Sequence, residues 1–468
     1  MRNRPISSAF VFTFAVLLTL HYSFPKLVAA EGDPEVILRP TPRRTGNAGE
    51  STLAPAGPHG RHGLLDKSFG TGGLVMESGQ PGQITHASDV ITQPDGRILL
   101  AGADTSGARI FRYEPDGSPD PTFGDNGSVT FGPEGLGVEG SVVAMALRPD
   151  GKIVVAGERT GPIPWDPSDW YRYVARLNPD GSLDTGFGTL GGFTVVGNSG
   201  GNERLDDLAL QSDGKIVVGG RRAVSGWEFY LARLNEDGSA DTGFGVSGGE
   251  LTTSFPGKVR AWVVSILIQP DGRIVAVGDA TNDVGIARYE PDGKLDTSFG
   301  TGGLLASDIL VGPKWGGLQP DGSIVVAGSW RDIPFPYPDM AVTRFSATGT
   351  LDTAFGDAGR ARIDFDKNYD AAEAGAIQAD GGIVVGGTAY VFNAGSARIA
   401  FGVARLDRDG RLDKRFGRGG RIAIRLGEPE LEAIALQPDG RVLTAGTNFV
   451  FNNSSSYFFT WFLARFRP

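Results

Sequence analysis

The sequence predicts an all-β fold: a seven-bladed β-propeller of four-stranded antiparallel blades, with the ring closed by pairing of the N- and C-terminal segments. Three observations predict it. Two Asp-Gly turn motifs alternate along the chain, apolar segments flank each turn, and the two chain ends carry complementary halves of one repeat. Helical repeats are excluded by the period-2 pattern and the 71 glycines. A parallel β-helix is the alternative, although its rungs are usually much shorter than these repeats.

The first motif of each repeat predicts the hairpin between the first and second strands of a blade. Stretches such as "LQPDGRVLTAG" place Asp-Gly between two apolar segments. Pro fixes φ for a turn, and Asp-Gly fills the positions that need a left-handed or small residue. The aspartates of the seven copies are Asp95, Asp150, Asp213, Asp271, Asp321, Asp380 and Asp439.

The second motif, for example "ARYEPDGKLDTSFGTGG" from Ala287, predicts the hairpin between the third and fourth strands. Asp follows Arg by eight residues and Phe follows it by eleven wherever both are present. Because Arg and Asp lie symmetrically about the turn, we expect a structural Arg–carboxylate pair across each hairpin, with the Phe packed nearby. The residues of these pairs are Arg112, Asp120, Arg176, Asp184, Arg233, Asp241, Arg288, Asp296, Arg344, Asp352, Arg405, Asp413, Arg465 and Asp66.

The two chain ends predict how the ring closes. Arg465 lacks the Asp and Phe that should follow it, whereas Asp66 and Phe69 lack a preceding Arg. Joining the ends completes a seventh unit and removes two exposed sheet edges. We therefore expect the segment "FLARFRP" to pair with residues around 64–75 and to place Arg465 beside Asp66.

Two segments precede the predicted propeller, which spans residues 64–468. Residues 1–30 carry Arg2 and Arg4 before an apolar run and end in small residues, the pattern of a secretory signal peptide. An uncleaved anchor is the alternative. Residues 31–63 are rich in Pro, Gly and charge, which predicts a disordered tether. The signal predicts a secreted or extracytoplasmic protein, in the periplasm or at the cell surface, without membrane insertion after cleavage.

Composition narrows the possible partners and chemistry. The formal net charge of −10 becomes more negative once the basic signal is removed, which disfavours nucleic acid and anionic lipid as partners. The absence of Cys excludes disulfides and thiolate metal sites. Of the 4 histidines only His86 falls within the predicted propeller, so a Ser-His-Asp triad or a multi-His metal site is disfavoured. We expect a monomer that uses no cofactor and no metal.

Two acidic patterns could form a functional site. "LDRDGRLD" from Leu406 resembles the start of a calcium loop through Asp407, Asp409 and Asp413, but Arg418 stands where an EF-hand loop needs Glu. Turn chemistry is therefore the favoured interpretation. A pair of carboxylates for glycoside cleavage stays open, because only the fold sets the distance between such groups.

The pairing of the "QPDG" and "PDGxLDxxFG" motifs resembles the delta-60 repeat family of exported bacterial proteins. The resemblance covers residues 64–468, and the paired motif recurs seven times. It implies export and a propeller, and it implies no particular activity or active-site residues. The departures are local, with Ser212 and Ala379 in place of the first turn's Pro and Thr348 in place of the second turn's Asp.

Loop length indicates which face carries specificity. Both Asp-Gly turns open on one face and are nearly constant in length, whereas the distance from the first turn's Gly to the next Arg varies from 16 to 25 residues. The extra residues lie between the second and third strands, on the opposite face. Aromatic side chains gather there, and the candidates for ligand binding are Trp165, Trp170, Trp330, Phe335, Tyr337, Tyr390, Phe392, Phe449 and Phe451.

These aromatics predict a non-catalytic binding or scaffold module for a protein or glycan ligand. They could instead cap the blades. The alternative function is a carbohydrate-active enzyme, a hydrolase or lyase that uses Asp and Glu on the same face. We expect an enzyme to bring acids together in the axial pocket, and a binding module to show aromatic edges on the rim.

Overall fold

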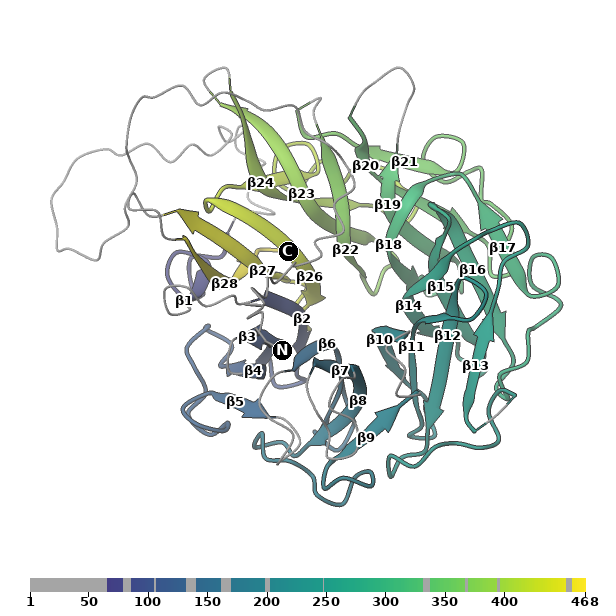
Figure 1. Cartoon of the computed structure of the whole chain (residues 1–468). Helices are drawn as coiled ribbons and strands as arrows, with labels where there is room; N and C mark the ends of the chain where they lie inside the picture. Colours follow the sequence, from purple (N-terminus) through teal and green to yellow (C-terminus); the bar gives the residue numbers. More distant parts are fainter. Residues whose placement is uncertain are drawn as a thin grey trace, which may run out of the picture. The chain divides into compact units, whose positions relative to one another are not determined.

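The computed structural model describes residues 65–78, 86–104, 107–131, 140–160, 170–197, 203–246, 248–330, 337–366, 369–393, 396–451 and 457–468. The segments predicted as signal peptide and tether lie outside these residues. The described residues form 28 strands in seven four-stranded antiparallel sheets, so the predicted fold class is confirmed (Figure 1). No helix in these ranges is long and apolar enough to cross a membrane.

Each sheet is one blade, numbered here in chain order. Blade 1 contains β2 (His86–Thr92), β3 (Ile98–Asp104), β4 (Gly107–Tyr113) and β5 (Ser128–Phe131). Blade 2 contains β6 (Ser141–Leu147), β7 (Ile153–Thr160), β8 (Trp170–Leu177) and β9 (Phe193–Val196). Blade 3 contains β10 (Glu203–Leu210), β11 (Ile216–Ala223), β12 (Trp227–Leu234) and β13 (Glu250–Thr253). Blade 4 contains β14 (Ala261–Ile268), β15 (Ile274–Ala280), β16 (Asp283–Tyr289) and β17 (Leu304–Ser307).

The remaining three blades follow the same order except at the end. Blade 5 contains β18 (Val311–Leu318), β19 (Ile324–Trp330), β20 (Asp339–Phe345) and β21 (Arg360–Ile363). Blade 6 contains β22 (Asp370–Ile377), β23 (Ile383–Asn393), β24 (Ser396–Leu406) and β25 (Arg421–Ile424). Blade 7 contains β26 (Glu428–Leu436), β27 (Val442–Phe451), β28 (Tyr457–Phe466) and, as its fourth strand, β1 (Leu74–Ser78).

The seventh blade joins distant parts of the chain. β1 pairs antiparallel with β28, in a register that sets Leu74 opposite Ala464 and Ser78 opposite Thr460. The Arg465 N–H donates to the Gly73 carbonyl over 3.0 Å, and the Asp66 N–H donates to the Arg465 carbonyl over 2.7 Å. The ring therefore closes by strand pairing, and the edge of β28 is covered.

The hydrophobic core lies between blades. Apolar runs such as "IVVAG" are buried on both faces of a sheet, so each blade packs against two neighbours. One cluster joins Val217 and Leu231 of blade 3 to Val263 and Ile274 of blade 4. The cluster at the closure joins Phe69 to residues of blade 1. Seven such clusters, one for each pair of neighbouring blades, hold the ring together.

The first strand of each blade lies nearest the axis and packs against the first strand of the next blade (Figure 1). Every first strand has an irregular register near its middle, as between Leu205 and Asp207 in β10. A bulge of this kind re-aims a side chain. We call the face with both Asp-Gly turns the turn face. The face where the second strand connects to the third, and one blade to the next, is the hairpin face.

Candidate functional site

The repeated Arg of the second motif connects its own hairpin to the next blade. Arg288 Nε lies 2.7 Å from Asp296 Oδ2, and the guanidinium carbon lies 4.9 Å from the centre of the Phe299 ring. Nη1 of the same Arg donates to the Ala347 carbonyl in blade 5. All seven predicted Arg–Asp pairs are close, with nitrogen–oxygen distances between 2.6 and 3.1 Å.

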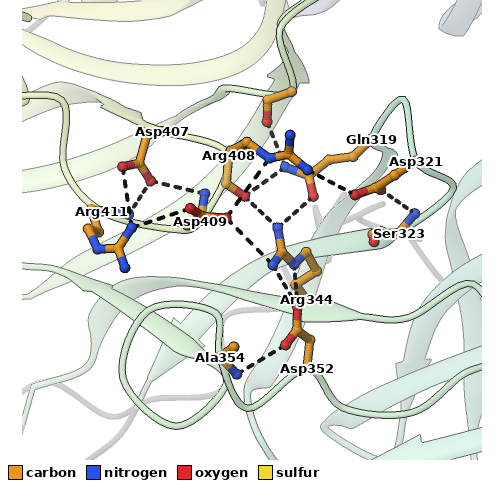
Figure 2. Close-up of polar contacts among 11 residues, drawn as sticks. Gln319, Asp321, Ser323, Arg344, Asp352, Ala354, Asp407, Arg408, Asp409 and Arg411 are labelled. Atoms are coloured by element: carbon orange, nitrogen blue, oxygen red, sulfur yellow. Dashed lines mark hydrogen bonds and ion pairs between the residues drawn. The ribbon is translucent and has the colours of Figure 1, made fainter.

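Figure 2 shows this arrangement between blades 5 and 6. Arg344 Nη2 lies 2.6 Å from Asp352 Oδ2, while its Nη1 donates to the Arg408 carbonyl over 2.6 Å and to Gln319 Oε1 over 3.1 Å. Gln319 Nε2 in turn donates to the Gly381 carbonyl over 2.6 Å. Gln319 of the first turn of blade 5 and Arg344 of its third strand are thereby bonded to both turns of blade 6.

The turn glycine of the second motif fits against the Phe of the preceding blade. At Gly349, where φ is +86°, an added Cβ would lie 2.9 Å from the Phe299 ring. The Gly300 N–H donates to the Thr348 carbonyl over 3.0 Å. Burial alone would raise the pKa of Asp296, but hydrogen bonds from Ser298 and the charge of Arg288 hold that pKa below its usual value. The motif is therefore a structural joint between blades.

The calcium-like stretch is also occupied by turn interactions. Asp407 Oδ1 accepts the N–H groups of Asp409 and Arg411 over 3.0 and 2.8 Å. Asp413 is paired with Arg405 at 3.0 Å and with Arg415 at 2.9 Å. These carboxylates therefore stabilise the turn and the contact between blades, as turn chemistry predicts (Figure 2 shows Asp407 and Asp409).

The nine aromatic candidates for ligand binding do not all lie on an exposed surface of the described structure. Trp165 and Phe335 lie outside the described residues, and for Trp170 in β8, Phe392 in β23 and Phe451 in β27 only the backbone is described. Trp330 ends β19 and packs against the cluster between blades 4 and 5. The guanidinium groups of Arg360 and Arg362 lie 4.5 and 5.6 Å from its ring centre. Trp330 therefore packs against its own blade and does not project from the hairpin face.

Three other candidates line the hairpin face. Tyr337 is 54% exposed, just before β20. Tyr390 in β23 is half-buried and meets Tyr369 edge to face at 5.7 Å between ring centres. Phe449 in β27 meets Phe459 of β28 at 4.4 Å in the same geometry. The structure thus brings Tyr390 together with a residue that was not predicted, Tyr369, which is 38% exposed.

Sequence reasoning also missed two tryptophans on blades 3 and 4, Trp227 and Trp262. Both are near arginines: the guanidinium carbon of Arg221 lies 5.1 Å from the Trp227 ring centre and 5.7 Å from that of Trp262. Loop length does not single them out, because Trp227 follows the short connection between β11 and β12. The aromatic and basic composition of "RRAVSGWEF" and "KVRAW" was the available signal.

A cluster of three carboxylates lies between blades 5 and 6. Oxygens of Asp339, Asp364 and Asp370 all lie within 4.8 Å of one another, close enough to hold a cation. Asp370 accepts the N–H groups of Phe365 and Tyr390 over 2.9 and 3.3 Å. Burial, and then the charges of the other two acids, raises the pKa of Asp370 to about 7. Asp339 and Asp370 are buried, which keeps both from a large substrate.

Charged side chains also line the axis. Lys314 Nζ lies 2.9 Å from Glu373, and His86 Nε2 lies 3.2 Å from Glu432. Both glutamates lie at the bulges of their strands, β22 and β26. Acids therefore do reach the axis, as an enzyme would need, but these two are each held by a basic partner.

Comparison with known proteins agrees with the fold. The chain matches the profile of a β-propeller family described as a domain of unknown function (DUF5122) over residues 93–123, 148–187, 211–244, 269–299, 319–355 and 378–416. This match supports a propeller repeat family. The matched segments fall on the Asp-Gly turns and the strands beside them. No curated protein matches the chain.

Solved structures resemble the chain at low identity. A protein of unknown function from Dyadobacter fermentans is 12% identical, with a TM-score of 0.41 over 84% of this chain and 100% of that one. A protein from Lactobacillus plantarum is 12% identical, with a TM-score of 0.43 over 78% and 94%. A gluconolactonase from Xanthomonas campestris is 12% identical, with a TM-score of 0.34 over 89% and 100%. Similarity at this level carries no argument about function.

Proposed function

We propose that the protein is an exported, non-catalytic binding module built from delta-60-like repeats, whose hairpin face over blades 5 to 7 recognises a protein or glycan. One observation carries the proposal. The second and third strands have 11 residues each in blade 6 and 10 each in blade 7, against 7 or 8 in the other blades. At about 3.3 Å per residue, the extra residues extend each hairpin by roughly 7–13 Å.

The aromatic side chains beside these hairpins suit recognition. We call Tyr337, Tyr369, Tyr390 and Phe449 the crest. Tyrosine offers a large apolar face together with a polar hydroxyl, and exposed aromatic anchors usually dominate binding interfaces. The crest draws on neighbouring blades, so one ligand could contact several of its members at once.

A glycan array combined with a hydrolysis screen tests this proposal. We expect the protein to bind at least one ligand without cleaving it, and the double variant Tyr337→Ala, Tyr369→Ala to lose that binding while melting as the wild type does. Val246→Ser is the matched control, because Val246 is 91% exposed and lies on the turn face. If the double variant binds the ligand with the affinity of the wild type, the crest is not part of the binding site.

The carbohydrate-active enzyme is the second candidate, favoured by the partly exposed acids Glu373 and Glu432 at the axis. Paired carboxyl groups are what glycoside cleavage needs. If the hydrolysis screen finds cleavage, and Glu373→Gln abolishes it without loss of folding, the enzyme replaces the binding module. Cleavage that survives in this variant would move the catalytic acids elsewhere.

A further inference from the structure

On the hairpin face, the tips of blades 6 and 7 bring a carboxylate close to two aromatic pairs. Glu428 begins β26 and is the direct cross-strand partner of Phe449 in β27. β26 also packs against β23 of blade 6 (Figure 1), and the pKa of Tyr390 in that strand is raised by burial and then by the charge of Glu428. Tyr390 meets Tyr369, and Phe449 meets Phe459, both edge to face. One acid therefore lies near aromatic rings of two neighbouring blades.

Two glutamates at this end of β26 have no basic partner. Glu428 and Glu430 are both exposed, and neither forms an ion pair with a residue that the structure describes. Like charges lie close together there, because the pKa of Glu430 is raised by burial and then by the charge of Glu432. A carboxylate beside other carboxylates gains most from a cation.

The two basic groups at the axis do not supply that cation. Lys314 Nζ lies 2.9 Å from Glu373, and His86 Nε2 lies 3.2 Å from Glu432, so each is already held by an acid of its own. Lys314 has its pKa raised, first by the charge of Glu373. Both glutamates at the tip of β26 therefore remain outside these pairs.

Two arginines of blade 6 lie in the same region without pairing with these acids. Arg398 is the cross-strand partner of Val391, so its side chain lies on the opposite face of the sheet from Tyr390. Arg425 stands three residues before Glu428 and is exposed, but it forms no ion pair with Glu428. Even when Arg425 is counted with the two axial bases, the four glutamates outnumber the bases.

A buried acceptor without a donor lies beside the same acid. Asn448, the residue before Phe449 in β27, is 1% exposed, and its Oδ1 accepts no hydrogen bond from the described residues. This oxygen faces Gly427, the residue before Glu428, where an added Cβ would lie 3.0 Å from it. A buried acceptor that lacks a donor is unfavourable. A ligand that brings N–H groups to Glu428 would supply the missing donor.

We propose that the tips of blades 6 and 7 bind a basic segment of a partner protein, with a Lys or Arg side chain packed on Tyr390 and Phe449. Its cation pairs with Glu428 and Glu430. Both side chains present an apolar stem that ends in a cation with several N–H donors, which matches aromatic rings beside unpaired carboxylates. The site is part of the crest, so it rests on the proposed function and narrows the ligand from a protein or glycan to a protein. Sugars carry hydroxyl groups, carboxylates or sulfates far more often than positive charge.

Direct binding measurements with four probes test the proposal: hexa-L-lysine, hexa-L-arginine, hexa-L-glutamate and the hexamer of glucosamine. We expect one of the two basic peptides to bind about tenfold or more tightly than hexa-L-glutamate, with affinity falling as salt rises. The tighter of the two identifies an ammonium or a guanidinium as the recognised group. Binding of neither basic peptide, equal binding of hexa-L-glutamate, or tighter binding of the cationic sugar would overturn the proposal.

Variants locate the site. Glu428→Gln combined with Glu430→Gln should weaken binding of the tighter basic peptide about tenfold or more, and both side chains are exposed, so the fold should persist. The matched control is Asp125→Asn with Asp292→Asn, which removes two exposed negative charges from blades 1 and 4. Unchanged affinity in the glutamate variant would refute the site. A loss as large in the control would show that the acidic chain attracts the peptide without a site, which also refutes it.

Two outcomes distinguish a wrong ligand class from a wrong binding surface. If the glycan array yields a ligand that the Tyr337→Ala, Tyr369→Ala variant no longer binds, and neither basic peptide binds, the crest remains a binding site and the cationic partner is refuted. If neither an array ligand nor a basic peptide depends on the crest, both proposals are wrong.

Discussion

The repeated Arg shows how one side chain can hold two elements. Arg288 neutralises a carboxylate in its own hairpin and donates to a carbonyl of the next blade. Arg273 also reaches Asp296, at 3.1 Å, but it is one-third exposed and lies within one blade. Both arginines therefore contact Asp296, but only Arg288 also donates a hydrogen bond to the next blade.

We expect Arg288→Ala to destabilise the protein by about 3 kcal/mol, because it leaves a buried carboxylate and a carbonyl short of donors. Arg273→Ala, the matched control, leaves Asp296 paired with Arg288 and should cost much less. Thermal or denaturant unfolding of the two variants measures the difference. Equal midpoints would mean that the repeated pair contributes no more than a surface ion pair.

Partly buried carboxylates beside the bulges should make stability depend on pH. Asp207 accepts the N–H groups of Leu208 and Ile266 over 2.8 and 2.6 Å, and burial raises its pKa to about 7. Its folded pKa lies above the unfolded value, so its contribution is full below about pH 4 and is lost as pH rises through 7. In blade 4, Ser265 accepts the corresponding N–H, from Gly316, without a charge.

Asp207→Ser therefore copies an arrangement that the chain already uses. Between pH 5 and 8 the wild type should lose more stability than the variant, by up to about 1.4 kcal/mol per pH unit. Melting curves at several pH values measure that difference. Parallel pH profiles for the two proteins would show that Asp207 does not titrate in this range.

At the scale of elements, the Asp-Gly turn is a packing surface as well as a turn. Gly238 and Gly248 both have positive φ, of 87° and 61°. A Cβ on Gly238 would lie 2.8 Å from the Phe187 ring of the preceding blade, whereas a Cβ on Gly248 would meet nothing within 4 Å. Substituting each glycine in turn therefore distinguishes the cost of backbone strain from the cost of a clash between blades.

Gly238→Ala should therefore cost more than Gly248→Ala. Each variant bears about 1–2 kcal/mol of backbone strain, and Gly238→Ala adds overpacking of roughly 1–3 kcal/mol. Denaturant midpoints compare them directly. A Gly248→Ala variant as unstable as Gly238→Ala would show that the turn matters only for its own conformation.

Sequence reasoning reaches the parts of these elements that depend on spacing within one repeat. The eight-residue separation of Arg288 and Asp296 was enough to predict that they face each other. The contact of Arg344 with the Arg408 carbonyl could not be predicted, because it depends on how one blade sits against the next. Tyr369 and Trp227 were missed for the same reason, since neither lies in a long hairpin and each gains aromatic or basic neighbours only through packing.

For the propeller as a whole, the decisive contact is the one between β1 and β28. Leu74 and Ala464 are direct partners, next to the hydrogen-bonded residues Gly73 and Arg465. Such non-hydrogen-bonded partners have Cα atoms about 4.5 Å apart, within the range that a disulfide bridges. The chain has no Cys of its own to interfere.

Leu74→Cys combined with Ala464→Cys should form a disulfide on air oxidation and stabilise the protein by about 4 kcal/mol, mainly by constraining the unfolded chain. Thiol titration and melting with and without reductant measure both effects. Leu74→Cys with Ala445→Cys is the control, because Ala445 lies on β27 and is not a partner of β1. Free thiols in the first variant would contradict the strand register at the closure.

The same closure imposes a delay during synthesis. Nearly four hundred residues separate β1 from β28, so at about 5–20 residues per second the ribosome needs on the order of a minute between making the two strands. Throughout that time β1 has no partner, and Phe69 lacks part of the apolar cluster that buries it. A nascent chain of this kind offers a holding chaperone a binding segment at its start, and it cannot become a closed ring before β28 has left the ribosome.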